Sequence, residues 1–157
     1  MLIHGEPRLT RDIDVTLGVD VSNLDDIRKI VSALSLETPV EVSESFVRET
    51  MVLPVFEKKS GVRVDFIFSN SIYERQAIPR AKPIRVANTA VLFASPEDLI
   101  IHKMVAGRPR DIEDVRSVLI KNSKLKVAYI RKWLVEFDTA LGGDRTKLFV
   151  KLLQDAK

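Results

Sequence analysis

The sequence contains no cysteine, two histidines and one tryptophan. The absence of cysteine excludes disulfide frameworks, thiolate zinc sites, iron–sulfur clusters and cysteine nucleophiles. Two histidines leave little for a histidine-based metal site. Any catalysis must therefore depend on carboxylates, lysines or hydroxyl groups.

Long hydrophobic runs and a targeting pattern are also missing. No run reaches the roughly 18 apolar residues that span a bilayer, and residues 1–5 lack the basic region and apolar stretch of a signal peptide. We therefore expect a cytoplasmic protein without a membrane partner. The net charge of +3, from 25 Lys and Arg against 22 Asp and Glu, permits a polyanionic partner but does not by itself indicate one.

The 157 residues suit one compact domain, and the pattern of apolar residues changes character near Ser95 and Pro96. Strand-like runs dominate before this point, over residues 13–17, 51–56, 62–68 and 90–93. Helical patterns follow it. The sequence predicts an α+β fold: a mixed β-sheet core over residues 1–95, then a C-terminal helical segment over 96–157 that packs on the core as one compact unit.

Capping and turn residues place the helices and one hairpin. One helix starts with Ser22 or Asn23 as its N-cap and runs to about Leu34, and a second covers about 72–77. Residues 58–61 contain Gly61 between two strand-like runs and predict a hairpin loop. The C-terminal helices are expected to start at Pro96 with Ser95 as N-cap, near 109, near 126 and near 144.

Two carboxylates share one face of the first strand-like run. Asp12 and Asp14 are two residues apart, whereas Ile13 and Val15 point to the other face. Two adjacent like charges repel unless a cation lies between them, so the pattern favours a Mg²⁺ clamp. The alternative is that both aspartates face solvent on an edge strand.

A third carboxylate comes from the run over residues 62–68. Alternation places Val64 and Phe66 on an apolar face and Asp65 on the opposite face, together with Arg63 and Ile67. If this strand lies beside the first, one sheet face presents three carboxylates. Such a set is what two-metal nucleotidyl transfer requires. A solvated strand residue is the alternative for Asp65.

Two segments carry a family resemblance. Residues 5–15, GEPRLTRDIDV, are similar to the G-x-x-R-x-T-x-D-I-D segment of the nucleotidyltransferase superfamily, which includes DNA polymerase β. Residues 95–115, SPEDLIIHKMVAGRPRDIEDV, resemble the E-D-L-x-x-x-K-x-x-A-x-R-x-x-D-x-x-D pattern of its AbiEii-type branch. The two motifs occur in order with a V-D-F strand between them.

The resemblance implies a mixed sheet that carries the aspartate triad and a helical tail that closes a nucleotide site. By position, Asp12, Asp14 and Asp65 would bind the metals, Lys103 would contact phosphate, and Asp111 would be catalytic or would support the catalytic groups. Arg8, Thr10, Lys103 and Arg108 are the expected nucleotide contacts. The branch includes toxins of toxin–antitoxin systems, some of which add nucleotides to tRNA.

The residues of the helical motif leave structural alternatives open. Lys103 emerges from the apolar stripe of its predicted helix, so it could pass along the core to solvent or reach a triphosphate. Asp111 and Asp114 border the core on one helix face. They could instead be a first-turn pair that bonds Arg108 or Arg110. Thr10 could simply hold a turn.

One part of the superfamily pattern is missing from this sequence. A Gly-Gly or Gly-Ser pair normally precedes the first aspartate by about ten residues, where backbone N–H groups meet the triphosphate. Alignment places that pair upstream of Met1. A shortened chain and a domain that has lost NTP binding are the two explanations, and a second copy of the chain would cover the sheet surface thus exposed.

The sequence therefore predicts a Mg²⁺-dependent nucleotidyltransferase with a two-metal site. It would transfer NMP from an NTP such as ATP to a hydroxyl of RNA, tRNA above all, in a toxin-like role with an antitoxin partner. The alternative is a truncated or degenerate domain that binds nucleotide, RNA or an antitoxin without turnover. Hydrolysis of phosphate esters by the same acids is a weaker third interpretation.

Overall fold

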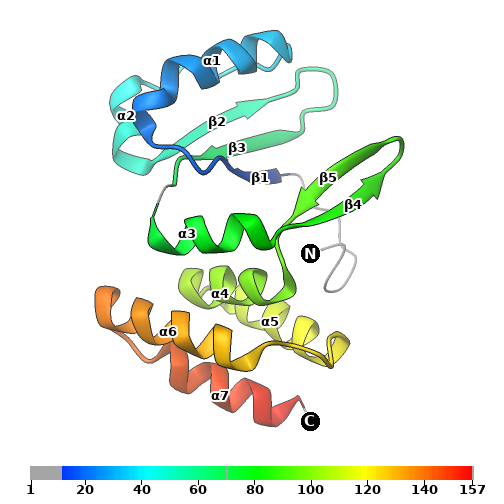
Figure 1. Cartoon of the computed structure of the whole chain (residues 1–157). Helices are drawn as coiled ribbons and strands as arrows, with labels where there is room; N and C mark the ends of the chain where they lie inside the picture. Colours follow the sequence, from blue (N-terminus) through cyan, green and yellow to red (C-terminus); the bar gives the residue numbers. More distant parts are fainter. Residues whose placement is uncertain (1–11, 70, 157) are drawn as a thin grey trace. The chain divides into compact units, whose positions relative to one another are not determined.

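The computed structural model describes residues 12–69 and 71–156 and confirms the predicted α+β class (Figure 1). The chain forms two compact units that divide between Gln76 and Ala77. We call the described residues up to Gln76 the sheet unit and those from Ala77 the helical unit.

The sheet unit contains a three-stranded mixed sheet in the order β1-β3-β2. Strands β1 (Asp12–Thr16) and β3 (Arg63–Ile67) are parallel, and β2 (Val52–Phe56) is antiparallel to β3. The predicted hairpin between β2 and β3 is confirmed: the Gly61 N–H donates to the Glu57 carbonyl at 2.8 Å. Gly61 has a φ of +67°, a left-handed conformation that favours glycine.

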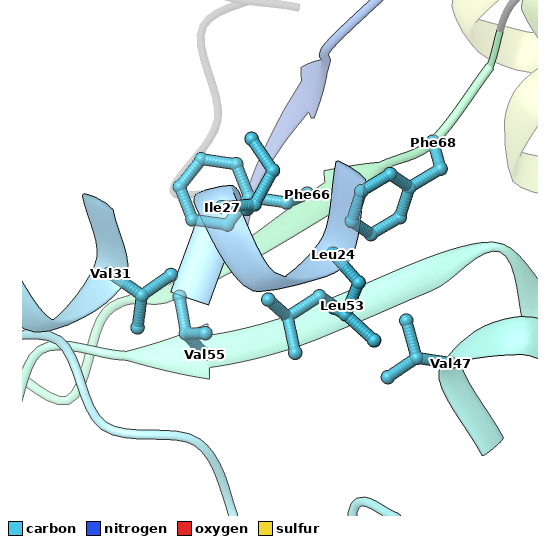
Figure 2. Close-up of a cluster of buried hydrophobic side chains, with 8 residues drawn as sticks. All are labelled: Leu24, Ile27, Val31, Val47, Leu53, Val55, Phe66 and Phe68. Carbon is cyan, nitrogen blue, oxygen red and sulfur yellow. The ribbon is translucent and has the colours of Figure 1, made fainter. Parts of the chain in front are cut away.

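Apolar residues from two helices and two strands form the core of the sheet unit (Figure 2). Helix α1 (Leu24–Ala33) contributes residues at helical spacing, and α2 (Glu44–Thr50) contributes Val47. The sheet contributes two buried residues of β2 and two of the 62–68 run, on the apolar face that the alternation predicted, and Val64 is partly buried against them. The full set is Leu24, Ile27, Val31, Val47, Leu53, Val55, Phe66 and Phe68. Each buried side chain contributes about 1.5–3 kcal/mol.

The N-terminal boundary of α1 agrees with the second of the two predicted N-caps, Asn23. A 3-10 turn, Val21–Asn23, precedes the helix, and its Ser22 N–H donates to the Asp20 carboxylate at 2.9 Å. Asn23 occupies the N-cap position of α1, but its side chain makes no capping hydrogen bond. Of the two predicted N-caps, Asn23 is therefore confirmed, and Ser22 lies in the 3-10 turn that Asp20 caps.

Helix α2 was not predicted at all. It is short, yet its start carries a capping signal: the Ser43 hydroxyl accepts a hydrogen bond from the Phe46 N–H at 3.1 Å, and Glu44 occupies the first turn. Its C-cap, Met51, is left-handed with φ +57°. Seven residues give too little periodicity to identify a helix from apolar spacing alone.

A separate two-stranded hairpin begins the helical unit. The predicted 90–93 run is part of β5 (Thr89–Phe93), which pairs antiparallel with β4 (Lys82–Val86) and not with the three-stranded sheet. Strand β4 escaped prediction because Pro83 interrupts its pattern. The turn uses Ala87 with φ +52°.

The predicted helices of the second half are all confirmed. They are α4 (Pro96–Ala106), α5 (Pro109–Lys121), α6 (Val127–Leu141) and α7 (Arg145–Asp155). Helix α3 (Ile72–Ala77), followed by a 3-10 turn over Ile78–Arg80, also has its predicted bounds. Ser95 caps α4, because its hydroxyl accepts from the Asp98 N–H at 3.1 Å.

The change from strands to helices falls at Ser95, between β5 and α4, as predicted. The compact units divide earlier, so the β4–β5 hairpin belongs with the helices. That residues 1–95 and 96–157 pack together as one unit stays a prediction. Within the described residues, no helix is long and apolar enough to cross a membrane.

Asp138 joins the last two helices, and its loss should destabilise them. Its carboxylate accepts the N–H groups of Arg145 and Thr146, each at 2.9 Å, at the start of α7. Burial alone would raise the pKa of Asp138, but these hydrogen bonds outweigh it and hold the pKa below the ordinary 3.8. We expect Asp138→Ala to lower the free energy of unfolding by about 1–2 kcal/mol at pH 7.

The pH dependence gives the check on this capping role. A lowered folded-state pKa stabilises the fold above the ordinary value and loses this contribution as the pH falls below it. The difference between wild type and Asp138→Ala in urea denaturation should thus be constant above pH 5 or so, and shrink below about pH 4. An equal difference at every pH would contradict the role of the ionised carboxylate.

Candidate functional site

The three predicted acids lie on one face of the β1-β3-β2 sheet. Asp14 is the register partner of Asp65 on the adjacent parallel strand, and Asp12 is the partner of Arg63. Neighbouring strands lie about 4.8 Å apart, so the Asp14 and Asp65 backbones are side by side. Ile13 is opposite Val64 on the other face. The predicted pairing of the two strands is confirmed.

The carboxylates differ in their surroundings. Asp12 and Asp14 are exposed at the edge strand, whereas the Asp65 side chain retains 21% of its exposure. Arg63 places Nη2 3.4 Å from both carboxylate oxygens of Asp65. The exposure of Asp12 and Asp14 on an edge strand agrees with the solvent-facing alternative, whereas the neighbouring position of Asp65 favours a cation site.

The donor set agrees with Mg²⁺ in its chemistry. Carboxylate oxygens are the ligands that Mg²⁺ prefers, and register brings Asp14 beside Asp65. In the described part of the chain, however, no three acidic or histidine side chains gather closely enough to hold a metal ion. Asp65 is instead paired with Arg63. The metal-binding roles of Asp12, Asp14 and Asp65 therefore stay predictions.

A cavity of about 470 Å³ lies at the β2 edge of the sheet. Its wall includes Phe46, Pro54, Phe56 and Arg63. Register pairs Pro54 with Asp65 and Phe56 with Arg63, which places both on the carboxylate face. Arg63 thus lines the cavity, and its guanidinium bonds the third carboxylate.

Lys103 forms the second cluster, within the helical unit. Its ammonium lies 2.8 Å from an Asp111 oxygen and 3.2 Å from an Asp114 oxygen. Both aspartates are buried, and Lys103 retains 27% of its side-chain exposure. The predicted position of Lys103 beside the apolar stripe is confirmed, because Ile100 and Met104 are fully buried.

Asp111 also closes the first turn of α5. Its second oxygen accepts the Arg108 backbone N–H at 3.3 Å, so the first-turn alternative is confirmed in part. The Arg108 side chain is exposed at the N-cap. Arg8 and Thr10, the other expected nucleotide contacts, lie outside the described residues. The roles predicted for Lys103, Asp111 and Arg108 in nucleotide binding and catalysis stay predictions.

The helical unit contains a buried polar network that the sequence did not predict. Asp98, 2% exposed, accepts hydrogen bonds from Ser95, Tyr129 (2.8 Å) and Arg80 (3.2 Å). Glu97 lies 3.4 Å from the same arginine. The motif E-D-L contains both acids, and helical spacing from Glu97 to Ile101 would have shown that this face is buried.

Contacts within this network shift the pKa values of Tyr129 and Glu97. Burial and the hydrogen bond to Asp98 raise the pKa of the Tyr129 hydroxyl, so it stays protonated and donates. Burial opposes ionisation of Glu97, but the Lys126 backbone N–H (3.0 Å) and Arg80 bring its pKa below the ordinary value. The Arg80 guanidinium also covers the Tyr129 ring at 3.9 Å. These contacts hold the Ile78–Arg80 turn against α4 and α6.

Comparison with known families shows which family the chain belongs to. Residues 1–146 match the family described as "Nucleotidyltransferase of unknown function (DUF6036)". The chain belongs to this nucleotidyltransferase family. Membership confirms the superfamily that the two motifs indicated, while the family description does not specify the AbiEii branch. No curated protein matches the chain.

The matched region of this nucleotidyltransferase includes both clusters. It contains the D-x-D strand, the V-D-F strand and the Lys103 helix, and it ends within α7. The acids on β1 and β3 therefore lie within the matched region.

Lys103 is expected to be essential for the stability of the helical unit whether or not it binds nucleotide. Lys103→Met leaves Asp111 and Asp114 without their cation, so the free energy of unfolding should fall by about 3 kcal/mol. Urea denaturation, monitored by Trp133 fluorescence, measures this change in the free energy of unfolding.

Two variants act as controls for Lys103. Lys103→Arg should restore most of the stability, and Lys124→Met, at an exposed loop position, should change it by less than about 0.5 kcal/mol. An unchanged denaturation midpoint in Lys103→Met would contradict the structural role. If Lys103→Arg folds normally but raises the KM for NTP, the lysine also contacts phosphate.

Proposed function

We propose that the chain is a Mg²⁺-dependent nucleotidyltransferase that transfers NMP from an NTP to a hydroxyl of an RNA acceptor such as tRNA. We further propose that it acts as an AbiEii-type toxin, controlled by an antitoxin protein. The observation that carries the proposal is the Asp14 and Asp65 pairing on one sheet face. Family membership supports nucleotidyl transfer as the reaction.

The carboxylates would divide the chemistry between them. Asp12 and Asp14 would hold two Mg²⁺ ions, and Asp65 would hold one of them. The metals would supply charge stabilisation on the phosphates and lower the pKa of the acceptor hydroxyl. Asp65 would take the proton as the acceptor oxygen bonds to the α-phosphorus and pyrophosphate leaves. Arg63 would then have to release Asp65.

Lys103 and Asp111 are the catalytic residues proposed in the helical unit. The ammonium has three donors: it donates to Asp111 at 2.8 Å and forms an ion pair with Asp114 at 3.2 Å. Lys103 would steady the leaving phosphates with the remaining donor or by exchanging one carboxylate for phosphate. Arg8, Thr10 and Arg108 are further proposed nucleotide contacts.

The test is nucleotide transfer by the purified chain. It is incubated with total tRNA, Mg²⁺ and each α-labelled NTP in turn, and labelled RNA is separated on a gel. The proposal expects label from at least one NTP that disappears when Mg²⁺ is chelated. Absence of label with all four NTPs and all RNA fractions would contradict it.

A domain that binds without turnover is the second candidate, and the Arg63 contact to Asp65 favours it. Thermal melting with an NTP separates the two. An active site should give stabilisation that requires Mg²⁺, about 2.7 kcal/mol at an NTP concentration 100 times its Kd. Equal stabilisation with and without Mg²⁺ would indicate the binding domain instead.

A further inference from the structure

The cavity at the β2 edge has a lining that the proposed chemistry leaves almost entirely unused. Its volume of about 470 Å³ falls within the range of about 300–1,000 Å³ that is usual for ligand sites. The lining comes from the segment before β2, from β2 and β3, and from the loop between these strands. All of these residues belong to the sheet unit, so the cavity is a feature of that unit alone.

Aromatic rings and prolines supply most of the apolar lining. Phe46 on α2 lines the cavity and is 42% exposed. Phe56 is half-buried, and backbone hydrogen bonds of 2.9 and 3.0 Å with Glu37 hold it at the end of β2. Pro39 and Pro54 add two further rings. Accessible aromatic side chains are the platforms on which unpaired bases of single-stranded RNA stack.

Two charged side chains supply the polar part of the lining. Glu41 is exposed and forms no hydrogen bond or ion pair through its carboxylate with any residue that the structure describes. Arg63 bonds Asp65 through Nη2, which leaves the other N–H donors of its guanidinium for a ligand. A carboxylate accepts the exocyclic amino group of a base, and a guanidinium donates to a base or a phosphate. The lining thus offers both kinds of partner to one nucleotide.

A peptide strand fits this edge poorly. Pro54 has no N–H group, and the N–H and carbonyl groups of Phe56 both bond Glu37. A peptide that adds to a sheet edge needs such backbone groups for its main-chain hydrogen bonds. The β2 edge therefore offers side-chain contacts and few backbone partners, which suits a base better than an added strand.

We propose that this cavity binds an unpaired base of the acceptor RNA, which stacks on Phe46 and donates its amino group to Glu41. That the base belongs to RNA rests on the proposed function. Pro54 and Phe56 lie on the carboxylate face, and β2 is two strand spacings from β1, about 10 Å. A few nucleotides of one strand, at about 3.4 Å each, span that distance. The cavity thereby positions the acceptor for reaction at the carboxylates.

The test is titration of the full chain with tetraadenylate, tetracytidylate and tetrauridylate, without NTP or Mg²⁺, followed by backbone amide shifts in nitrogen-15 correlation spectra. Saturable shifts are expected at residues 41–46, 55–56 and 61–63. Because the three ligands share one phosphate chain, differences in affinity report the base. Tetrauridylate, whose bases lack an amino group, should bind about threefold more weakly or less tightly still. Equal affinities, or shifts only at other residues, would overturn the assignment.

Three variants assign the contacts, and circular dichroism checks that each is folded. Phe46→Ala should weaken binding of tetraadenylate about tenfold through lost stacking. Glu41→Ala should lower the affinity for tetraadenylate to near that for tetrauridylate and change the latter by less than about twofold. Ile30→Ala shortens an exposed apolar side chain of α1 outside the cavity lining and should bind as wild type does. Losses of equal size in Phe46→Ala and Ile30→Ala, or no loss in either, would overturn the assignment.

Two further arms separate this inference from others. Tighter binding of N-acetylphenylalaninamide than of tetraadenylate at the same residues would indicate a site for a peptide side chain and overturn the base. In the transfer assay, Phe46→Ala should raise the KM for RNA and leave the KM for NTP unchanged, and a rise in the KM for NTP alone would overturn RNA as the source of the base. Base-dependent binding by a chain that transfers no nucleotide leaves this inference standing while the proposed function fails.

Discussion

Replacing Asp14 by asparagine is expected to reduce nucleotide transfer at least about 1,000-fold, the largest activity change in this account. Asp14 would hold both cations, whose charge stabilisation of the transition state contributes several kcal/mol, and about 4 kcal/mol corresponds to a factor of 1,000. Its register partner Asp65 would be left without a shared cation. The measurement is the initial rate of label transfer from α-labelled NTP to RNA.

The fold should survive this change. Asp14 is exposed, and removing one of two adjacent like charges relieves repulsion with Asp65, so stability without Mg²⁺ should be equal or slightly higher. Asp25→Asn, an exposed acid on α1, is the matched control and should keep full activity. An Asp14→Asn rate within tenfold of wild type would exclude Asp14 from metal binding.

Asp98→Ala is expected to destabilise the helical unit by about 3–5 kcal/mol, the largest stability change. Asp98 is 2% exposed and accepts from Arg80, Ser95 and Tyr129, so its removal takes a buried acceptor from two hydroxyls and leaves Arg80 with Glu97 as its remaining carboxylate. With total stabilities of about 5–15 kcal/mol, this loss approaches complete unfolding. Urea denaturation followed by Trp133 fluorescence reports the helical unit directly.

Two variants define the origin of that loss. Tyr129→Phe removes a single hydrogen bond and should lower the free energy of unfolding by about 1 kcal/mol. Glu113→Ala, at an exposed position on α5, should have almost no effect. A loss below about 1 kcal/mol for Asp98→Ala would show that Arg80 and its partners do not hold the turn to the helices.

Local chemistry explains what the sequence could predict. Alternation over residues 62–68 correctly separated Asp65 from Phe66, because burial of one sheet face imposes a period of two. Ser95 and Pro96 marked the start of α4 because capping requires only neighbouring residues. The same holds for Gly61 in the hairpin loop.

Features that depend on distant residues were harder to predict. The Asp98 network joins Tyr129, 31 residues along the chain, and no local pattern announces that partner. Strand β4 contains Pro83 and pairs away from the main sheet, so its composition argued against a strand. Helix α2 is too short for apolar periodicity to reveal it.

The candidate site has features that local sequence could predict and features that depend on distant residues. The acids and Lys103 could be chosen from their spacing and residue types, but the side-by-side position of Asp14 and Asp65 depends on strand pairing across about 50 residues. The Arg63 contact to Asp65 depends on a rotamer, and the salt bridges of Lys103 depend on how α4 packs on α5.

Paramagnetic broadening by Mn²⁺ tests the central claim, that the β1 and β3 carboxylates hold the catalytic cations. Mn²⁺ replaces Mg²⁺ at oxygen ligands and broadens nearby backbone amide signals in a nitrogen-15 correlation spectrum. With NTP present, the account predicts selective loss of signals from residues 13–15 and 64–66 in the wild type and their retention in Asp14→Asn. Broadening at other residues, or equal broadening of these signals in both proteins, would contradict it.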